Sequence, residues 1–192
     1  GSGGQNKIIS SNNTFIGGGN SNTINNESNH SIIVGGEYND ISGTLLGFIG
    51  NGKKNNINDS GHSFIGGGFN NTINNHSNYS NIVNGFKNDI SGTFLGFIGN
   101  GESNKIYGRS DESCIVNGKK NKINDSENTF IGGGNSNTIN NESNHSIIVG
   151  GEQNDISGET LYGFIGNGKE CNIENSNFSG IVDGSSNKIT NS

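Results

Sequence analysis

A unit of sixteen or seventeen residues recurs eleven times along this chain, and it constrains the fold more than any other feature. Its purest copy reads Ile-Gly-Gly-Gly-Asn-Ser-Asn-Thr-Ile, from Ile16 to Ile24. We number the copies as coils 1 to 11 by one anchor residue each, and a fragment of a further copy with its anchor at Asn6 precedes them. The anchors are Asn22, Asn39, Asn55, Asn71, Asn88, Asn104, Asn121, Asn137, Asn154, Cys171 and Asn187. A repeat of this length predicts a stack of near-identical coils.

Two isoleucine columns accompany the anchors, one six residues before each anchor and one two residues after it. The two isoleucines of a unit are eight residues apart, about half a coil, and each lies in a β-compatible stretch, which predicts two short strands per coil. Residues at the anchor and two beyond it point to the same side of a strand, so we expect both inside the coil. The interior residues expected in this way include Ile16, Asn22, Ile24, Ile33, Asn39, Ile41 and Cys171. Stacked anchor amides would then hydrogen-bond from coil to coil, and Cys171 would give up those bonds.

The composition by itself is typical of disorder, with 34 glycines, no proline and 27% hydrophobic residues. The strict placement of the isoleucines overrules that interpretation, because a disordered chain has no reason to keep two apolar columns in phase. We predict an all-β fold, a parallel β-solenoid of 11–12 coils that forms a single repeat domain over residues 5–192. Residues 1–4 would lie outside it, with Gly1-Ser2 a cloning remnant, and the lack of methionine indicates a piece of a longer protein.

Glycines and length changes predict the turns. A glycine stands three residues before each anchor, where it would supply the positive φ that one turn requires. The other turn follows the second strand and takes up the difference between sixteen and seventeen residues. We therefore expect this second turn to be where the coil tolerates change.

The outer face of the first strand is apolar, whereas that of the second strand is polar. The column seven residues before the anchors reads Phe15, Ile32, Phe48, Phe64, Asn81, Phe97, Cys114, Phe130, Ile147, Phe164 and Gly180. Each phenylalanine in it is followed two residues later by glycine, and every other residue by valine, so the volume stays roughly constant, as in a close-packed interface. We predict that these columns pack against identical chains around a shared axis. Asn81 would there form either a tolerated polar layer with trapped water or a layer that binds an ion or fixes the register.

The unit Ser-x-Ile-x-Gly-Gly-x-x-Asn-x-Ile-x-Gly, seen from Ser31 to Gly43 and from Ser146 to Gly158, resembles the head repeats of YadA-like trimeric autotransporter adhesins. Related repeats occur in phage and viral fibres. The resemblance covers about residues 5–190 and implies a left-handed parallel β-roll, a homotrimer, and display on a cell or virion surface for host attachment and virulence. A viral or phage fibre shaft that acts as a spacer is one alternative. A monomeric surface-binding solenoid, such as an ice-binding protein, is another.

We expect no enzyme activity, metal or cofactor. The four histidines have no carboxylate or serine placed to complete a triad, and the aspartate position of calcium-binding repeats is asparagine in nearly every copy. If the chain binds a host protein or glycan, the variable second turns are the expected place. The candidate ligand-binding residues in or near these turns are His30, His62, His76, Tyr79, Arg109 and His145.

The net charge and the lack of long apolar runs argue against nucleic acid and membrane as partners. The net charge is −6 and the 11 basic residues are scattered along the sequence, so we expect neither a basic patch nor nucleic-acid binding. No apolar run is long enough for a membrane-spanning helix, so we expect no membrane insertion by this segment. Cys114 and Cys171 lie three coils apart, roughly 14 Å for stacked strands, which predicts that no disulfide joins them.

Overall fold

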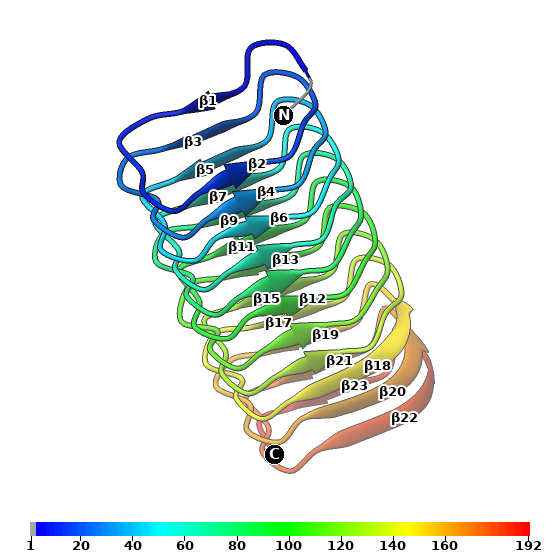
Figure 1. Ribbon diagram of the computed structural model, residues 1–192. Helices are drawn as coiled ribbons and strands as arrows, with labels where there is room; N and C mark the ends of the chain where they lie inside the picture. The colour runs from blue at the N-terminus through cyan, green and yellow to red at the C-terminus, as the bar shows by residue number, and fades with distance from the viewer. Residues whose placement is uncertain (1–2) are drawn as a thin grey trace.

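The chain winds into a parallel β-solenoid of two sheets without any helix in residues 3–192, the part that this computed structural model describes (Figure 1). Gly1 and Ser2, the expected cloning remnant, lie outside the described residues. Odd-numbered strands form a 12-stranded sheet and even-numbered strands form an 11-stranded sheet. The predicted all-β solenoid with two strands per coil is therefore confirmed.

The odd sheet consists of β1 (Lys7–Ile8), β3 (Thr23–Asn25), β5 (Asp40–Ser42), β7 (Asn56–Asn58), β9 (Thr72–Asn74), β11 (Asp89–Ser91), β13 (Lys105–Tyr107), β15 (Lys122–Asn124), β17 (Thr138–Asn140), β19 (Asp155–Ser157), β21 (Asn172–Glu174) and β23 (Lys188–Thr190). The even sheet consists of β2 (Phe15–Ile16), β4 (Ile32–Ile33), β6 (Phe48–Ile49), β8 (Phe64–Ile65), β10 (Asn81–Ile82), β12 (Phe97–Ile98), β14 (Cys114–Ile115), β16 (Phe130–Ile131), β18 (Ile147–Glu152), β20 (Phe164–Lys169) and β22 (Gly180–Ser185).

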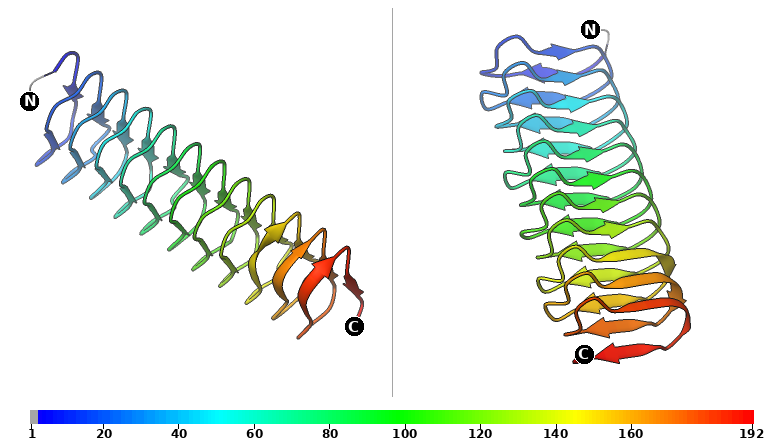
Figure 2. Two further views of the ribbon diagram at one scale, coloured as in Figure 1. Left: turned by 90° about the vertical axis from the view of Figure 1, so that its right-hand side faces the viewer. Right: turned by 90° about the horizontal axis from the view of Figure 1, so that it is seen from below.

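The core is a double column of isoleucines between the two sheets. Each coil lies in register on the last, so that Ile24 of β3 pairs with Ile41 of β5, and Ile33 of β4 pairs with Ile49 of β6. The isoleucines of both columns are buried from Ile16 to Ile181. Figure 2 shows the resulting rod from two further sides, with the coils stacked along its whole length. The expected interior positions are confirmed.

The anchor asparagines form the predicted ladder, which satisfies three backbone groups per coil. Asn104 Oδ1 accepts a hydrogen bond from the Asn121 N–H at 3.0 Å. Its Nδ2 donates to the carbonyl oxygens of Asn100, at 3.1 Å, and Gly118, at 2.9 Å. The Asn121 N–H bond is buried and the two carbonyl bonds are partly buried, so losing the amide would cost most at the Asn121 N–H.

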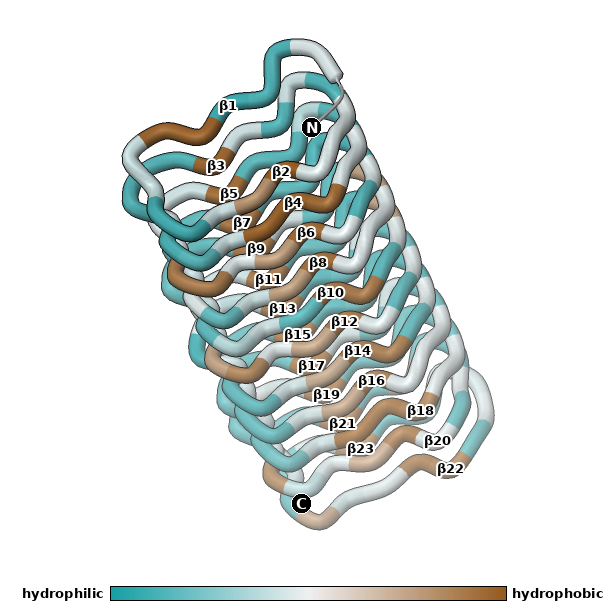
Figure 3. Tube along the Cα trace, in the orientation of Figure 1, coloured by the Kyte–Doolittle hydropathy of each residue, from teal (hydrophilic) through white to brown (hydrophobic). Residues whose placement is uncertain are grey.

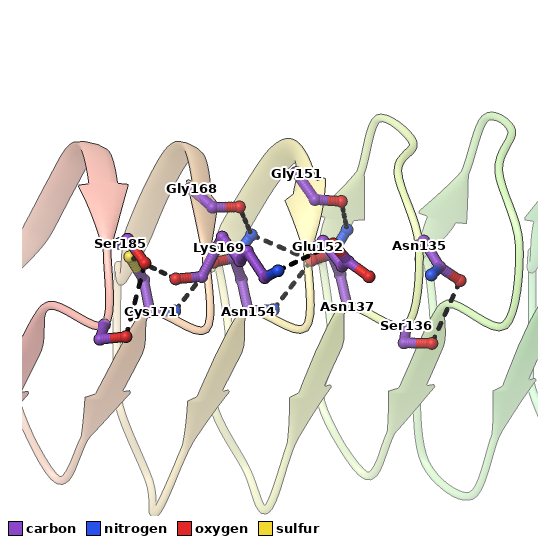
Figure 4. A network of polar contacts seen from close by, with 11 residues as sticks. Asn135, Ser136, Asn137, Gly151, Glu152, Asn154, Gly168, Lys169, Cys171 and Ser185 are labelled. Carbon is purple, nitrogen blue, oxygen red and sulfur yellow. Dashed lines mark hydrogen bonds and ion pairs between the residues drawn. The ribbon is translucent and has the colours of Figure 1, made fainter.

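Cys171 interrupts the asparagine ladder, as Figure 4 shows where Asn137, Asn154 and Cys171 follow one another along the stack. The Cys171 N–H still donates to Asn154 Oδ1 at 3.0 Å. Its Sγ lies 3.5 Å from the carbonyl oxygen of Gly184, at hydrogen-bond distance for a thiol. A cysteine has no amide oxygen to accept the next anchor N–H, that of Asn187. The expected loss of a ladder hydrogen bond therefore occurs between Cys171 and Asn187.

Buried hydroxyl groups form two more ladders inside the second turn, which the sequence analysis did not predict. Ser77 Oγ accepts a hydrogen bond from the Thr93 N–H at 3.2 Å and donates to the Asn74 carbonyl oxygen at 2.6 Å. The buried hydroxyl residues are Ser28, Ser31, Thr44, Ser60, Ser63, Ser77, Ser80, Thr93, Ser110, Ser113, Ser126, Thr129, Ser143, Ser146, Thr160 and Ser176. One hydroxyl column is continuous from Ser28 to Ser176, whereas Gly47, Gly96 and Gly163 interrupt the other.

The length difference between coils is confined to one inserted residue, placed just before the first buried hydroxyl of the second turn. Glu27, His76, Arg109, Glu142 and Glu159 occupy this position in the five seventeen-residue coils. Each of them is exposed or partly exposed. The second turn therefore tolerates change at its surface and not in its interior.

Left-handed backbone shapes the first turn at two positions. The glycine three before the anchor has the predicted positive φ in ten of the eleven coils, for example +85° at Gly19, and Gly168 in the cysteine-anchored coil is the exception. The residue just before the anchor also has positive φ in every coil although it is never glycine, as at Lys54 (φ 57°). The Lys54 N–H donates to the Glu37 carbonyl oxygen at 2.9 Å, and this coil-to-coil bond offsets the steric cost of the conformation.

Candidate interaction surfaces

Nothing in residues 3–192 has the geometry of a metal site or a membrane-spanning helix. The part of the chain that the structure describes contains no group of three or more His, Cys, Asp or Glu side chains placed to hold a metal ion. It also contains no helix long and apolar enough to cross a membrane. The candidate functional sites described below are surfaces of the rod.

The outer side of the even sheet is a continuous apolar stripe, which we call the apolar face. It consists of the residues seven and five before each anchor, and Figure 3 shows apolar residues recurring on successive even strands along the stack. Phe15 is 56% exposed, Val34 is 48% exposed and Val149 is 49% exposed. Ile32, Phe48, Phe64 and Phe130 are half-buried by their neighbours along the stripe. In the single chain, no other element packs against this face.

The pairing of phenylalanine with glycine has a local cause. The Phe64 ring lies beside Gly66, where an added Cβ would be 3.2 Å from Phe64 Cε1. The same Cβ would overlap the carbonyl oxygen of Val83 in the next coil. Gly17, Gly50, Gly99, Gly132 and Gly166 have the same two neighbours, a phenylalanine ring and a carbonyl oxygen of the next coil. The ring thus takes the space that valine fills in the other coils, which keeps the apolar face level.

Asn81 and Cys114 are the two departures from hydrocarbon on the apolar face that we expected to meet at the axis. Both are half-buried. Asn81 Nδ2 donates to the Tyr79 carbonyl oxygen at 3.2 Å, so part of its amide is satisfied within its own chain. Cys114 is a free thiol, as is the buried Cys171, which confirms that no disulfide joins them. Burial raises the pKa of the Cys114 thiol.

The structure separates the candidate ligand-binding residues of the second turn into two columns. His30, His62, Tyr79 and His145 share one column, the left-handed position two residues before the even strand. His76 and Arg109 lie in the other, at the inserted position. The first column carries stacked rings, with 4.6 Å between the centroids of His62 and Tyr79 and 5.0 Å between those of His145 and Tyr162. Stacking covers the ring faces and leaves mainly their edges exposed.

The outer side of the odd sheet, which we call the polar face, is polar as expected. Its central column, one residue after each anchor, reads Lys7, Thr23, Asp40, Asn56, Thr72, Asp89, Lys105, Lys122, Thr138, Asp155, Asn172 and Lys188. Desolvation raises the pKa values of the Asp40, Asp89 and Asp155 carboxyl groups. Lys105 opposes the effect at Asp89, because a nearby cation favours the ionised carboxylate.

A narrow column of parallel bridges separates the two sheets at the first turn and consists of the residues two before each anchor. Ion pairs join successive coils here, with Glu37 and Lys53 2.9 Å apart and Glu102 and Lys119 3.0 Å apart. Phe69 and Phe86 stack in the same column, with 5.5 Å between ring centroids. The side chains of these ion pairs are about half exposed, so each pair contributes little to stability. Their main effect is that the glutamate and lysine charges of the column neutralise each other.

Three of the lysines that are scattered along the sequence come together on the polar face. Lys105, Lys120 and Lys122 line one shallow groove with Ser103, Ser136 and Thr138. The expectation that no basic patch forms is therefore wrong, because residues sixteen or seventeen apart in sequence become neighbours in adjacent coils. No spacing within a single unit contains this information.

No protein-family model matches the chain, and no curated protein sequence matches it either. Many kinds of repeat protein have a β-solenoid fold, so the fold is not specific to adhesin heads. The resemblance to those repeats therefore stays a prediction, together with the chain number and handedness that it implies.

Proposed function

We propose that this chain is an attachment segment of a trimeric extracellular fibre, in which three copies pack their apolar faces around a common axis. The observation that carries this proposal is the exposed apolar stripe along the even sheet. Monomeric proteins rarely expose apolar stripes of this length, because the hydrophobic effect favours covering them.

A second copy of this chain suits the apolar face better than an unrelated partner. The stripe runs the full length of the stack, roughly 55 Å for eleven or twelve coils, and keeps the same height in each coil. A partner that covers it must repeat with the same spacing, which an identical parallel chain does. The number three comes from the resemblance to trimeric adhesin heads. The polar face then turns outward, as its aspartates, lysines and hydroxyl groups require.

One further observation favours the fibre shaft of a phage or virus as a second candidate. Residues 14–43 recur almost unchanged as 129–158, with Tyr38 replaced by Gln153. Near-identity of this kind suits a spacer, since a spacer needs length more than a unique site. Both candidates share the trimeric rod and differ in whether its surface binds a ligand.

Cross-linking through the natural cysteines tests the shared axis. A short bismaleimide should join Cys114 of one protomer to Cys114 of another, because three copies of this residue would meet at the axis. Cys171 is buried and serves as an internal control that should not react. Cys114→Ser should abolish the covalent dimer, and adding Asn56→Cys on the polar face should not restore it. A Cys114 that reacts with a monofunctional maleimide but never cross-links would refute the proposal.

A further inference from the structure

We infer that the groove lined by Lys105, Lys120 and Lys122, which we call the lysine groove, binds the sulfate groups of a sulfated saccharide. The groove has a volume of about 330 Å³ and crosses coils 6 to 8 on the polar face. This inference deepens the proposed function, because it assigns a ligand class to the face that the fibre would turn outward. It differs from the expectation that recognition lies in the variable turns.

Most lysines in the described part of the chain have a close carboxylate or aromatic partner, and the three lysines of the groove, like Lys7, do not. Lys53, Lys119, Lys169 and Lys188 each lie within 4 Å of a carboxylate, and Lys54 and Lys87 each lie over a phenylalanine ring. Within residues 3–192, Lys105, Lys120 and Lys122 have neither kind of partner. Asp89 on the adjacent strand attracts Lys105, but it lies beyond ion-pair distance, so all three ammonium groups stay available to an anion from solution.

The strand register makes this arrangement costly without a ligand. Lys105 of β13 pairs directly with Lys122 of β15, so two like charges stand side by side on one face of a parallel sheet. Directly opposed like charges destabilise a sheet. Lys120 borders the same groove from the left-handed position just before the anchor (φ 57°). A bound oxyanion would relieve this repulsion.

The other groove residues match a sugar better than a simple anion. Ser103, Ser136 and Thr138 place three hydroxyl groups beside the lysines, where they can exchange hydrogen bonds with sugar hydroxyl groups and sulfate oxygens. The groove is open and continues into a neighbouring polar groove that shares Ser103 and Lys105. That neighbouring groove contains Asp89, so only the part lined by the three lysines suits an anion.

Carboxylates limit the length of anion that the groove accepts. Asp89 pairs with Lys105 on one side, and Asp155 pairs with Thr138 on the other. The basic stretch between them spans roughly 10 Å along the stack, since adjacent strands are about 4.8 Å apart. A nucleic acid would meet these carboxylates, and the lining of the groove offers no aromatic ring for base stacking. A short sulfated saccharide fits this length and charge.

Two double variants with equal charge changes test the inference. Lys120→Ala/Lys122→Ala removes one lysine just before an anchor and one just after it, within the groove. Lys7→Ala/Lys54→Ala removes lysines from the same two columns outside the groove and serves as the matched control. All four side chains lie on the surface, so both proteins should fold, which circular dichroism would check.

Titration calorimetry with a heparin-derived tetrasaccharide at physiological salt gives the readout. We expect the groove variant to bind at least tenfold more weakly than the unmodified chain, and the control to change by less than about twofold. Absence of binding to the unmodified chain, or equal losses in both variants, would overturn the inference. Equal affinity for the desulfated tetrasaccharide, for inorganic sulfate or for single-stranded DNA of the same charge would overturn the ligand class.

The mass of the protein in the same samples separates this inference from the proposed function. A monomer that binds the tetrasaccharide would refute the fibre and leave the lysine groove standing. A trimer that fails to bind would refute the lysine groove alone.

Discussion

Asn104 Oδ1 accepts a hydrogen bond from the backbone N–H of Asn121 at 3.0 Å, one coil further along the rod. The same relationship joins every pair of successive anchors from Asn6 to Cys171. It ends at Asn187, because Cys171 offers no amide oxygen. The asparagine ladder thus links each coil to the next through side chain and backbone together.

Removing one rung of this ladder should destabilise the rod. Asn104→Ala leaves the Asn121 N–H and the Asn100 carbonyl without their partners, while the Gly118 carbonyl keeps the Glu102 N–H, and we expect the free energy of unfolding to fall by about 2 kcal/mol. Cys171→Asn should have the opposite effect and raise it by about 1 kcal/mol, because the Asn187 N–H gains an acceptor. Urea denaturation measures both, and a Cys171→Asn protein that is less stable than the parent would contradict the ladder account.

The pairing of phenylalanine with glycine should be visible in single and double variants. Gly66→Val introduces side-chain atoms that meet the Phe64 ring and the Val83 carbonyl oxygen. We expect a loss of about 2 kcal/mol, typical of overpacking. Adding Phe64→Ile should recover part of the loss, because the ring contact disappears while the backbone contact stays. Equal stability of the single and double variants in urea denaturation would show that the ring plays no role.

The inserted residue of the second turn should be dispensable, unlike the hydroxyl next to it. Deleting His76 converts a seventeen-residue coil to sixteen residues, the length of its neighbours, so we expect a change of less than about 1 kcal/mol in the free energy of unfolding. Ser77→Ala should cost about 2 kcal/mol, since the buried Thr93 N–H loses its acceptor and the Asn74 carbonyl oxygen loses one of its hydrogen bonds. Thermal denaturation of the two variants compares them, and a reversed order would contradict the buried hydroxyl ladder.

Stability should depend on pH through the aspartates of the polar face. Desolvation raises the folded-state pKa of Asp40 above its ordinary value of 3.8. Between the unfolded-state pKa and the higher folded-state pKa of Asp40, the unfolded chain is ionised while the folded protein still holds its proton. The folded state therefore loses stability as the pH rises through this interval, and it does not regain that stability at higher pH. Asp40→Asn should therefore stabilise the protein increasingly as the pH rises through this interval, and by a constant amount above it. Urea titrations at several pH values check this, and a constant difference between the two proteins would contradict it.

The repeat predicted the fold because its apolar residues recur at positions that only a coil of fixed length can stack. Ile24 and Ile41 could be assigned to the interior from their spacing alone, and so could Asn22 and Asn39. The hydroxyl ladders were missed because serine and threonine are also common in exposed turns, so Ser77 looks no different in sequence from a solvent-exposed residue. The lysine groove was missed because Lys105 and Lys122 become neighbours only across coils.

The mass of the protein in solution tests the central claim, the covered apolar face, most directly. Light scattering on the purified chain should give about 60 kDa, three times the chain mass of 20.1 kDa, at concentrations well above the dissociation constant. Replacing Phe48 and Phe64 with serine should shift that mass toward the monomer. A mass of 20.1 kDa for the unmodified chain at all concentrations would contradict the account and leave the apolar face without its proposed partner.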